Sequence, residues 1–325
     1  MAEKNRKIEQ SIVGHKHWFI EAIIRLVQEK HLATFGAIII LLMGFVAIFG
    51  DLIAPYGMNE THFEAVLQPP GASWLLGTDS LGRDILSRCI IGTRITLFVG
   101  LGATALVAMI AVSIGIVSGY IGGRFDIFLQ RFVDAWMCLP PLIILLIMSA
   151  ILGPSMLNAI VAIGVLLGIP DSRIVRSQVL MVKEEQYVQA AVACGCNDLQ
   201  VIIMHIVPNV VPTAIIVATM EFGYCILIEA TISFLGFGVP PPYPTWGGML
   251  GGTSLYHMTS APWLSVWPGL LLAAAVFGAN MFGDGIRDIL DPQLRGSGSA
   301  RSALKAARIK GIFWRLKTIL KKKEN

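Results

Sequence analysis

Long runs of apolar residues without a charge limit what this chain can fold into more than any other feature. The first run extends from Leu32 to Phe49, and further runs follow to about residue 286. A helix of about 20 apolar residues crosses the hydrocarbon core of a bilayer. Charged residues make up 14% of the 325 positions, whereas soluble domains carry about 25%, so the charges are confined between the runs. The sequence therefore predicts an all-α, polytopic membrane protein.

Six of the runs are long enough to be transmembrane helices. We expect them near 32–50, 95–118, 127–152, 155–170, 208–234 and 263–286. Gly153 and Pro154 predict a tight turn between the third and fourth spans, and Pro170 with Asp171 is expected to end the fourth. The first run is longer than the apolar core of a cleaved signal peptide, so we expect it to remain as a span.

The distribution of Lys and Arg predicts which side of the membrane each connection faces. Cytoplasmic connections carry the excess of positive charge. The segment before the first span is basic, and the tail contains three consecutive lysines at 321–323, whereas the connection 236–262 has no Lys or Arg. We therefore expect a multi-pass protein of the cell inner membrane with both termini, and the connection before residue 208, on the cytoplasmic side.

The connection 236–262 is rich in Pro, Gly and aromatic residues, which predicts turns rather than a helix. Trp246 and Tyr256 could lie in the aromatic belt at the membrane surface. The connection is either a lid over the bundle or a surface that meets a substrate or a docking protein.

No motif for enzyme chemistry or a resident metal is present. The sequence has no G-x-x-x-x-G-K-[ST] phosphate loop, no H-E-x-x-H and no G-x-S-x-G. Its five cysteines form no C-x-x-C pair, which argues against a disulfide or zinc framework. We expect no catalytic residue, no metal and no bound cofactor. If ATP drives this protein, the ATPase is another chain.

The segment YVQAAVACGCNDLQVIIMHIVPN, residues 187–209, is polar enough to lie outside the bilayer. Tyr187, Ala190, Ala191 and Cys194 recur at the spacing of one helix face. Gly195 stands where a helix end favours a left-handed residue.

A second short helix is predicted after this glycine. Asn197 and Asp198 supply N-cap chemistry, and Pro208 suits the first turn of the fifth span. Apolar residues then recur at helical spacing, namely Leu199, Ile202, Ile203 and Ile206. The two helices form either a hairpin that packs only on its own domain or a contact through which a partner applies force to the fifth span.

This segment resembles the cytoplasmic EAA loop of ABC importer permeases, E-A-A-x-x-x-G-x9-I-x-L-P. The chain has Gln189-Ala190-Ala191, Gly195 and His205-Ile206-Val207-Pro208; Gln189 replaces the Glu, and His205 stands at the Ile position. In that family the loop is the coupling helix that sits in a groove on the ATPase. The resemblance therefore implies an ATPase-coupling loop with the contact residues Tyr187, Gln189, Ala190, Ala191, Gly195, Cys196, Asn197, Asp198, Leu199, His205 and Pro208.

Three further segments are similar to C-type permease subunits of the dipeptide, oligopeptide and nickel transport branch. They are LGTDSLGRDILSR (76–88), ISFLGFGVPPPYPTWGGML (232–250) and GDGIRDILDPQLR (283–295). The resemblance covers roughly residues 30–295, and departs from the branch at GIPDSRIVR (168–176) and in the long tail.

What the resemblance implies is a type I, MetI-like permease fold with six transmembrane helices that imports peptides or related small solutes. It implies four kinds of partner: a homologous second permease subunit, two ATPase subunits that use ATP, an extracytoplasmic substrate-binding protein, and membrane lipid. No nucleic acid is expected.

The chain divides into four parts on this basis. Residues 1–31 form a cytoplasmic N-terminal segment, and 32–94 form the first transmembrane helix and an extracytoplasmic loop. Residues 95–290 form the permease core with the coupling loop 182–208. Residues 291–325 form a basic cytoplasmic tail, either a helix on an anionic leaflet or a solvated end.

Glu221 and Glu229 lie within the fifth span. A charge at the centre of a bilayer costs at least about 2.5–3.5 kcal/mol, so both side chains are expected to face the bundle interior or water. They could line the translocation pathway, or form hydrogen bonds between helices. In an alternative class, an ion- or proton-coupled secondary transporter, they would be the ion sites.

Two other patterns concern helix ends and helix packing. Asp284, Arg287, Asp288 and Asp291 form a ladder near the cytoplasmic end of the sixth span, which we expect to fix the helix end beside the coupling loop. Gly115, Gly119 and Gly123 recur every four residues, which predicts a small-residue face for close packing inside the bundle or against a second permease.

Overall fold

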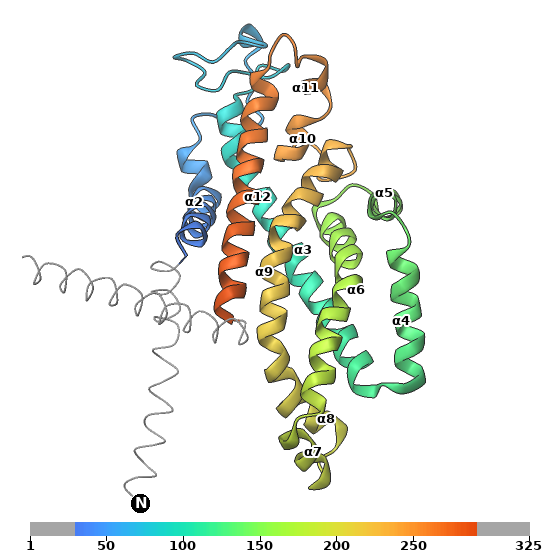
Figure 1. The fold of residues 1–325 in the computed structure, drawn as a ribbon. Coiled ribbons are helices and arrows are strands. Elements are labelled where there is room, and N and C mark those ends of the chain that lie inside the picture. Colours follow the sequence, from blue (N-terminus) through green and yellow to red (C-terminus); the bar gives the residue numbers. More distant parts are fainter. Residues whose placement is uncertain (1–29, 291–325) are drawn as a thin grey trace, which may run out of the picture.

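The computed structural model describes residues 30–290, and within that range the chain consists of helices and loops without a β-strand (Figure 1). The long helices are α2 (His31–Ile53), α3 (Ile85–Ile121), α6 (Met156–Lys183), α9 (Val207–Phe234) and α12 (Trp263–Leu290). The shorter elements are η1 (Phe63–Ala65), α4 (Gly123–Met137), α5 (Pro141–Leu152), α7 (Gln186–Ala193), α8 (Asp198–Val201), η2 (Ile202–Ile206), α10 (Trp246–Leu250) and α11 (Thr253–Tyr256).

Five stretches of the described range are long and apolar enough to cross a membrane, namely α2, α3, α6, α8 through α9, and α12. The pair α4 and α5 passes the same test together, so the total rises to six if this bent pair is one span. The predicted all-α, polytopic membrane fold is confirmed. The four-part division of the chain stays a prediction, because most of its first and last parts lie outside the described residues.

The predicted third span, 127–152, is wrong as a single helix. α4 ends at Met137 and α5 begins at Pro141, and the two axes meet at 92°. Pro140 and Pro141 explain the break, because neither has an amide hydrogen to donate and each disfavours a helical conformation in the residue before it. The predicted turn at Gly153 and Pro154 does separate α5 from α6.

The predicted end of the fourth span at Pro170 is also wrong, because α6 runs from Met156 to Lys183 through this proline. Pro170 cannot donate the usual hydrogen bond to the carbonyl of Leu166 four residues earlier. The indole nitrogen of Trp136, on α4, donates to that carbonyl oxygen at 3.2 Å instead. Prolines persist in membrane helices where another group satisfies the freed carbonyl.

The second span begins earlier than predicted, at Ile85 rather than near 95. Asp84 caps the helix by accepting a hydrogen bond from the Ser87 amide at 2.8 Å. The polar residues that masked this start are paired: Arg88 Nη1 donates to the Met58 carbonyl at 2.9 Å, and Arg94 Nε donates to the Ala47 carbonyl at 2.7 Å.

The main core lies where α3 crosses α6 and α9. Gly115 and Gly119 allow α3 to approach α6 closely, since a Cβ atom on either would come within 3 Å of the side chains of Val175 and Val179. This confirms internal packing for two of the three predicted glycines. Gly123 takes no part in that face, because α3 ends at Ile121 and Gly123 begins α4.

The two connections that we expect on the extracytoplasmic side span 54–84 and 235–262 in the structure, and they lie at the same end of the bundle (Figure 1). The second of them contains α10 and α11. Trp246 was expected at the membrane surface, and this is wrong: its side chain is 1% exposed, and its Nε1 donates to the Cys89 carbonyl at 3.0 Å. Tyr256 is 86% exposed. Trp263 Nε1 donates to the Thr78 carbonyl, which joins α12 to the first connection.

Candidate functional site

The loop between α6 and α9 lies at the opposite end of the bundle from α10 and α11 (Figure 1). Its first helix, α7, ends in a Schellman motif. The Cys196 amide donates to the Ala191 carbonyl at 3.1 Å, and the Gly195 amide donates to the Val192 carbonyl at 3.0 Å. Gly195 has φ +88°, the left-handed region that favours glycine. The predicted turn at Gly195 is confirmed.

The second helix of the loop, α8, begins with a complete capping box. The Asn197 side-chain oxygen accepts from the Gln200 amide at 2.9 Å, and the Gln200 side-chain oxygen accepts from the Asn197 amide at 3.0 Å. Both otherwise unpaired amides of the helix start are thereby satisfied. Asn197 is the N-cap, and Asp198 is the first residue of the helix.

The predicted second short helix is not separate from the fifth span, because α8, η2 and α9 form one continuous helical stretch from Asp198 to Phe234. η2 is a π-helical turn in which the Val207 amide donates to the Ile202 carbonyl, five residues earlier. Pro208 lies in the first turn of α9, as predicted. A displacement of α8 therefore acts directly on α9.

The π turn also changes which apolar residues face inward. Ile206 is buried whereas Leu199 is 65% exposed, although their spacing places them on one face of a regular α-helix. A π turn has more residues per turn, and so it rotates the following side chains relative to the preceding ones. Val188, Val201 and Ile206 pack in one apolar cluster with Val179 and Val182 at the end of α6.

The outer surface of the loop is apolar and exposed. We call it the loop's apolar face and define it as Tyr187, Val192, Leu199, Ile203 and Met204, each between 44% and 66% exposed. Contiguous exposed apolar surface outside a bilayer usually marks an interaction site. Gln189 and Ala190 are also exposed, and Ala191 is half-buried. A rigid, capped segment therefore presents an apolar surface at the end of the bundle.

The remaining predicted loop residues stabilise the loop locally. Gln189 Nε2 donates to the Glu184 carbonyl at 3.2 Å, and the His205 carbonyl accepts from Asn209 Nδ2 at 2.7 Å. The rings of Tyr187 and His205 lie 6.1 Å apart, which joins the two halves of the loop. Cys196 is half-buried and Pro208 is exposed.

One residue that the sequence reasoning missed, Tyr120, contacts this loop and is itself contacted by Lys183. Tyr120, in the last turn of α3, donates from its hydroxyl to Asp198 Oδ1 at 2.9 Å. Lys183, at the end of α6, donates from Nζ to the Tyr120 carbonyl at 2.7 Å. No local pattern places Tyr120 near Asp198, because the two residues are 78 positions apart.

Glu221 and Glu229 have different surroundings. Glu229 is fully buried, and its Oε1 accepts from Ser233 Oγ at 2.7 Å. Glu221 is half-buried, and it lies close enough to Asp171 on α6 for their charges to interact. Both glutamates have one buried oxygen without a hydrogen-bond partner. A contact with something outside this chain is therefore open to Glu221 and closed to Glu229.

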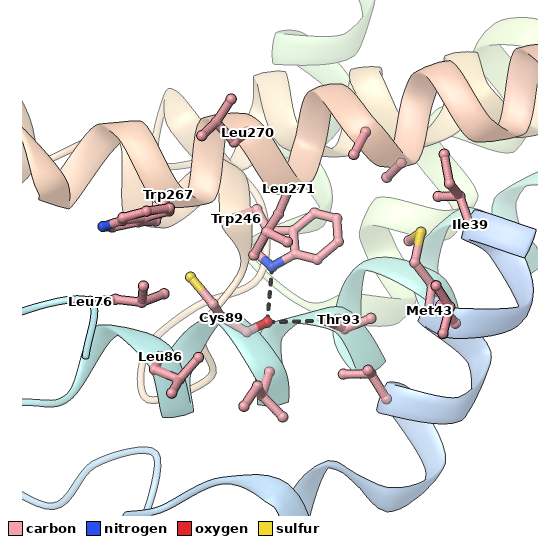
Figure 2. Close-up of a pocket in the computed structure, with 15 residues that line it drawn as sticks. Ile39, Met43, Leu76, Leu86, Cys89, Thr93, Trp246, Trp267, Leu270 and Leu271 are labelled. Carbon is pink, nitrogen blue, oxygen red and sulfur yellow. Dashed lines mark hydrogen bonds between the residues drawn. The ribbon is translucent and has the colours of Figure 1, made fainter. Parts of the chain in front are cut away.

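A second feature is an apolar cavity of about 700 Å³ between α2, α3, α10 and α12 (Figure 2). Its lining includes Ile39 and Met43 on α2, and Leu270 and Leu271 on α12. The polar atoms of Thr93 and Trp246 both donate to the Cys89 carbonyl, as Figure 2 shows, so neither faces a solute. This cavity offers no chemistry for a charged substrate.

The acidic ladder on α12 does not lie beside the loop. Asp288 forms an ion pair with Lys30 immediately before α2, with Nζ and Oδ2 2.5 Å apart, and Arg287 contacts the sulfur of Met220 on α9. Asp291 and the basic tail lie outside the described residues. Within the range 30–290, no group of three His, Cys, Asp or Glu side chains could hold a metal ion.

Two family comparisons match this chain. Residues 111–296, more than half of the chain, match the family described as binding-protein-dependent transport system inner membrane component. Residues 19–70 match the N-terminal TM domain of oligopeptide transport permease C.

Similar proteins cover most of this chain. The dipeptide transport system permease protein DppC of Alkalihalophilus pseudofirmus is 38% identical over 275 residues, 85% of this chain and 90% of that protein. The oligopeptide transport system permease protein OppC of Bacillus subtilis is 36% identical with the same coverage of 85% and 90%. The glutathione transport system permease protein GsiD of Pectobacterium atrosepticum is 33% identical, covering 82% of this chain and 89% of that protein. The helical bundle with five or six candidate spans, the capped loop and these matches together show that the chain belongs to the binding-protein-dependent transport system inner membrane components, the permeases of ABC importers.

Proposed function

We propose that this chain forms half of a translocation pathway for peptides or related small solutes, paired with a homologous second permease. Its family makes it a membrane transport component rather than an enzyme, and one that works with a substrate-binding protein and an ATPase. Two ATPase subunits would use the ATP, and this chain would bind no cofactor of its own. The peptide class is supported by the names of relatives such as the dipeptide and oligopeptide permeases.

The ATPase would dock on the loop between α6 and α9. The observation that carries this proposal is the loop's apolar face, held by a capping box and a Schellman motif on residues that resemble the EAA motif. Because α8 continues into α9, a push on the loop would tilt or shift α9, and the bundle would open to alternate sides. The loop and both termini would lie in the cytoplasm, as the Lys and Arg distribution predicts.

Glu221 would line the pathway, whereas Glu229 would serve packing. Glu221 is half-buried in this chain alone and neighbours Asp171, so the two carboxyl groups could attract the ammonium group of a peptide. The buried Glu229 bonds to Ser233 on its own helix. The ion-coupled alternative is not favoured, because the chain matches the binding-protein-dependent family and its relatives are named as transport-system permeases.

Docking is tested by purifying the tagged permease together with the subunits encoded beside it. Leu199→Asp places a charge in the centre of the proposed contact, and we expect the retained ATPase to fall at least about tenfold. Leu255→Asp is the matched control, because Leu255 is comparably exposed in the connection at the opposite end. Full retention of the ATPase by the Leu199 variant, with a normal amount of permease in the membrane, would refute docking at this loop.

Uptake separates the two transport classes. We expect uptake of a radiolabelled dipeptide, glycylleucine, to stop when ATP is depleted and to continue after an uncoupler collapses the proton gradient. The reverse result would support the ion-coupled class. If only Glu221 faces the pathway, Glu221→Gln should reduce uptake of this dipeptide, which carries an N-terminal ammonium group, more than Glu229→Gln does.

A further inference from the structure

Tyr120 connects three elements at the cytoplasmic end of the bundle. Its hydroxyl donates to Asp198 Oδ1 at 2.9 Å, at the start of α8. Its carbonyl accepts from Lys183 Nζ at 2.7 Å, at the end of α6, and the same ammonium lies 5.2 Å from the centre of the Tyr120 ring. Tyr120 itself belongs to the last turn of α3. One residue therefore joins α3, α6 and α8.

Helix-end chemistry explains why these contacts form. The last carbonyl groups of α3 have no amide partner within the helix, because the chain leaves the helix at Gly122, with φ +69°. A lysine at such an end satisfies a carbonyl and interacts favourably with the helix dipole. Asp198 is free to accept from Tyr120, because Asn197 and Gln200 form the capping box of α8 without it.

The contact lies next to the proposed docking surface, because Asp198 and Leu199 are neighbours in α8. Leu199, in the loop's apolar face, directly follows Asp198, so a partner that pushes on Leu199 also moves the Asp198 carboxylate. Beneath both, Val188 and Val201 pack against Val179 and Val182, so the loop moves together with the end of α6. The Tyr120 hydroxyl adds a polar link from α8 to α3, beside the apolar contacts that Ala111 and Ile116 of α3 make in the same cluster.

We propose that Tyr120 is a positioning residue for transport: it transmits movement between the ATPase-docking loop and α3, in parallel with the direct path through α9. The inference rests on the proposed docking function of the loop. An exposed hydrogen bond contributes little to stability, so the role of this one is to keep α3 in step with α8. α3 in turn reaches the outer connections, where Arg88 bonds to the Met58 carbonyl.

Tyr120→Phe removes the hydroxyl and leaves the ring and the backbone carbonyl for Lys183. In the complete complex reconstituted in liposomes, we measure ATP hydrolysis with and without the binding protein purified with its bound ligand. Retained ATPase and unstimulated hydrolysis should match the wild type. The stimulation by binding protein should fall about fivefold, the factor expected for one lost hydrogen bond.

Variants of Asp198 provide a check that does not depend on Tyr120. Asp198→Asn keeps an oxygen acceptor and should keep the stimulation, whereas Asp198→Ala should lower it as Tyr120→Phe does. The double variant Tyr120→Phe, Asp198→Ala should be no worse than either alone, because both remove the same bond. Ser113→Ala is the control, since that hydroxyl on α3 bonds only to the Met109 carbonyl of its own helix, among the contacts of the described residues.

Two results would overturn the inference. Normal stimulation in Tyr120→Phe and Asp198→Ala shows that the bond transmits nothing. Loss of the ATPase from either variant shows that the bond supports docking instead. Failure of the proposed docking function looks different, because Leu199→Asp would then retain the ATPase whatever the Tyr120 variants do.

Discussion

Gly195 sets the direction in which the loop leaves α7, and it does so through its backbone alone. Its φ is +88°, and a Cβ atom there would meet nothing within 4 Å. A substitution at this position is therefore penalised by backbone conformation and not by a clash.

Because backbone conformation and not a clash penalises a side chain at Gly195, two substitutions there should differ in effect. Gly195→Val should cost about 1–2 kcal/mol, because a β-branched residue avoids the left-handed region, and should weaken ATPase binding up to about tenfold. Gly195→Asn should have a much smaller effect, because Asn tolerates this conformation. The retained ATPase in purified complexes measures both, and equal losses would show that the site responds to side-chain size.

At the residue scale, the local signals in the loop could be predicted and the distant contacts could not. Gly195, Asn197 and Pro208 act on neighbours within a few positions, so their roles are legible in the sequence. Tyr120 acts on Asp198 across the bundle, and this depends on how α3 crosses α6. The burial of Glu229 likewise depends on packing, whereas its bond to Ser233 follows from a spacing of four.

Among the elements, α6 depends on a neighbour to pass through Pro170. Pro170 has no amide hydrogen to donate to the Leu166 carbonyl, and the indole nitrogen of Trp136 donates to that carbonyl instead. Trp136→Phe should expose a buried carbonyl without a partner and cost about 1–3 kcal/mol. In a Pro170→Ala background the backbone amide returns and bonds to Leu166, so the same substitution should cost less. Unfolding temperatures in detergent, compared across the four proteins, measure this; equal losses in both backgrounds would contradict the explanation.

α2 provides a second prediction at this scale. A Cβ atom at Gly36 would lie 2.5 Å from the Gly278 carbonyl oxygen of α12, whereas one at Gly44 would meet nothing within 4 Å. Gly36→Leu should separate the helices and destabilise the protein by about 1–3 kcal/mol, the usual cost of overpacking. Gly44→Leu on the same helix is the matched control. Similar unfolding temperatures for the two variants would show that α2 does not need this close contact.

The errors in the predicted elements share one cause. Hydropathy identifies where a span can be, but prolines and charges within a span were interpreted as its end. Pro170 and Arg94 both have partners from another helix, Trp136 through Leu166 in one case and the Ala47 carbonyl in the other. Consecutive prolines at 140 and 141 had the opposite effect and broke a run that hydropathy joins.

For the whole molecule, the orientation in the membrane is open to a direct test. Cys194 is exposed in the loop and Tyr256 is 86% exposed at the opposite end. In a variant that keeps only Cys194, a membrane-impermeant maleimide should react in inside-out vesicles and not in intact cells. A variant without native cysteines that carries Tyr256→Cys should show the reverse. Labelling of Cys194 from outside would place the loop in the wrong compartment for an ATPase.

The order of the apolar stretches along the chain could be predicted at this scale, because each follows from local composition. Their arrangement could not: hydropathy gives no indication that α2 lies against α12 or that α3 crosses the centre of the bundle (Figure 1).

The attachment of α2 to α12 bears on how the protein is made. Lys30 and Asp288, which pair in the folded chain, are 258 positions apart, so a ribosome completes nearly the whole polypeptide before the first helix meets its main neighbour. Until then α2 can pack only against α3, through contacts such as the bond from Arg94 to the Ala47 carbonyl. Its mean hydropathy of 2.7 is the highest of the five apolar stretches in the described range. This high hydropathy keeps the newly inserted α2 stable in the bilayer until α12 has been synthesised and inserted.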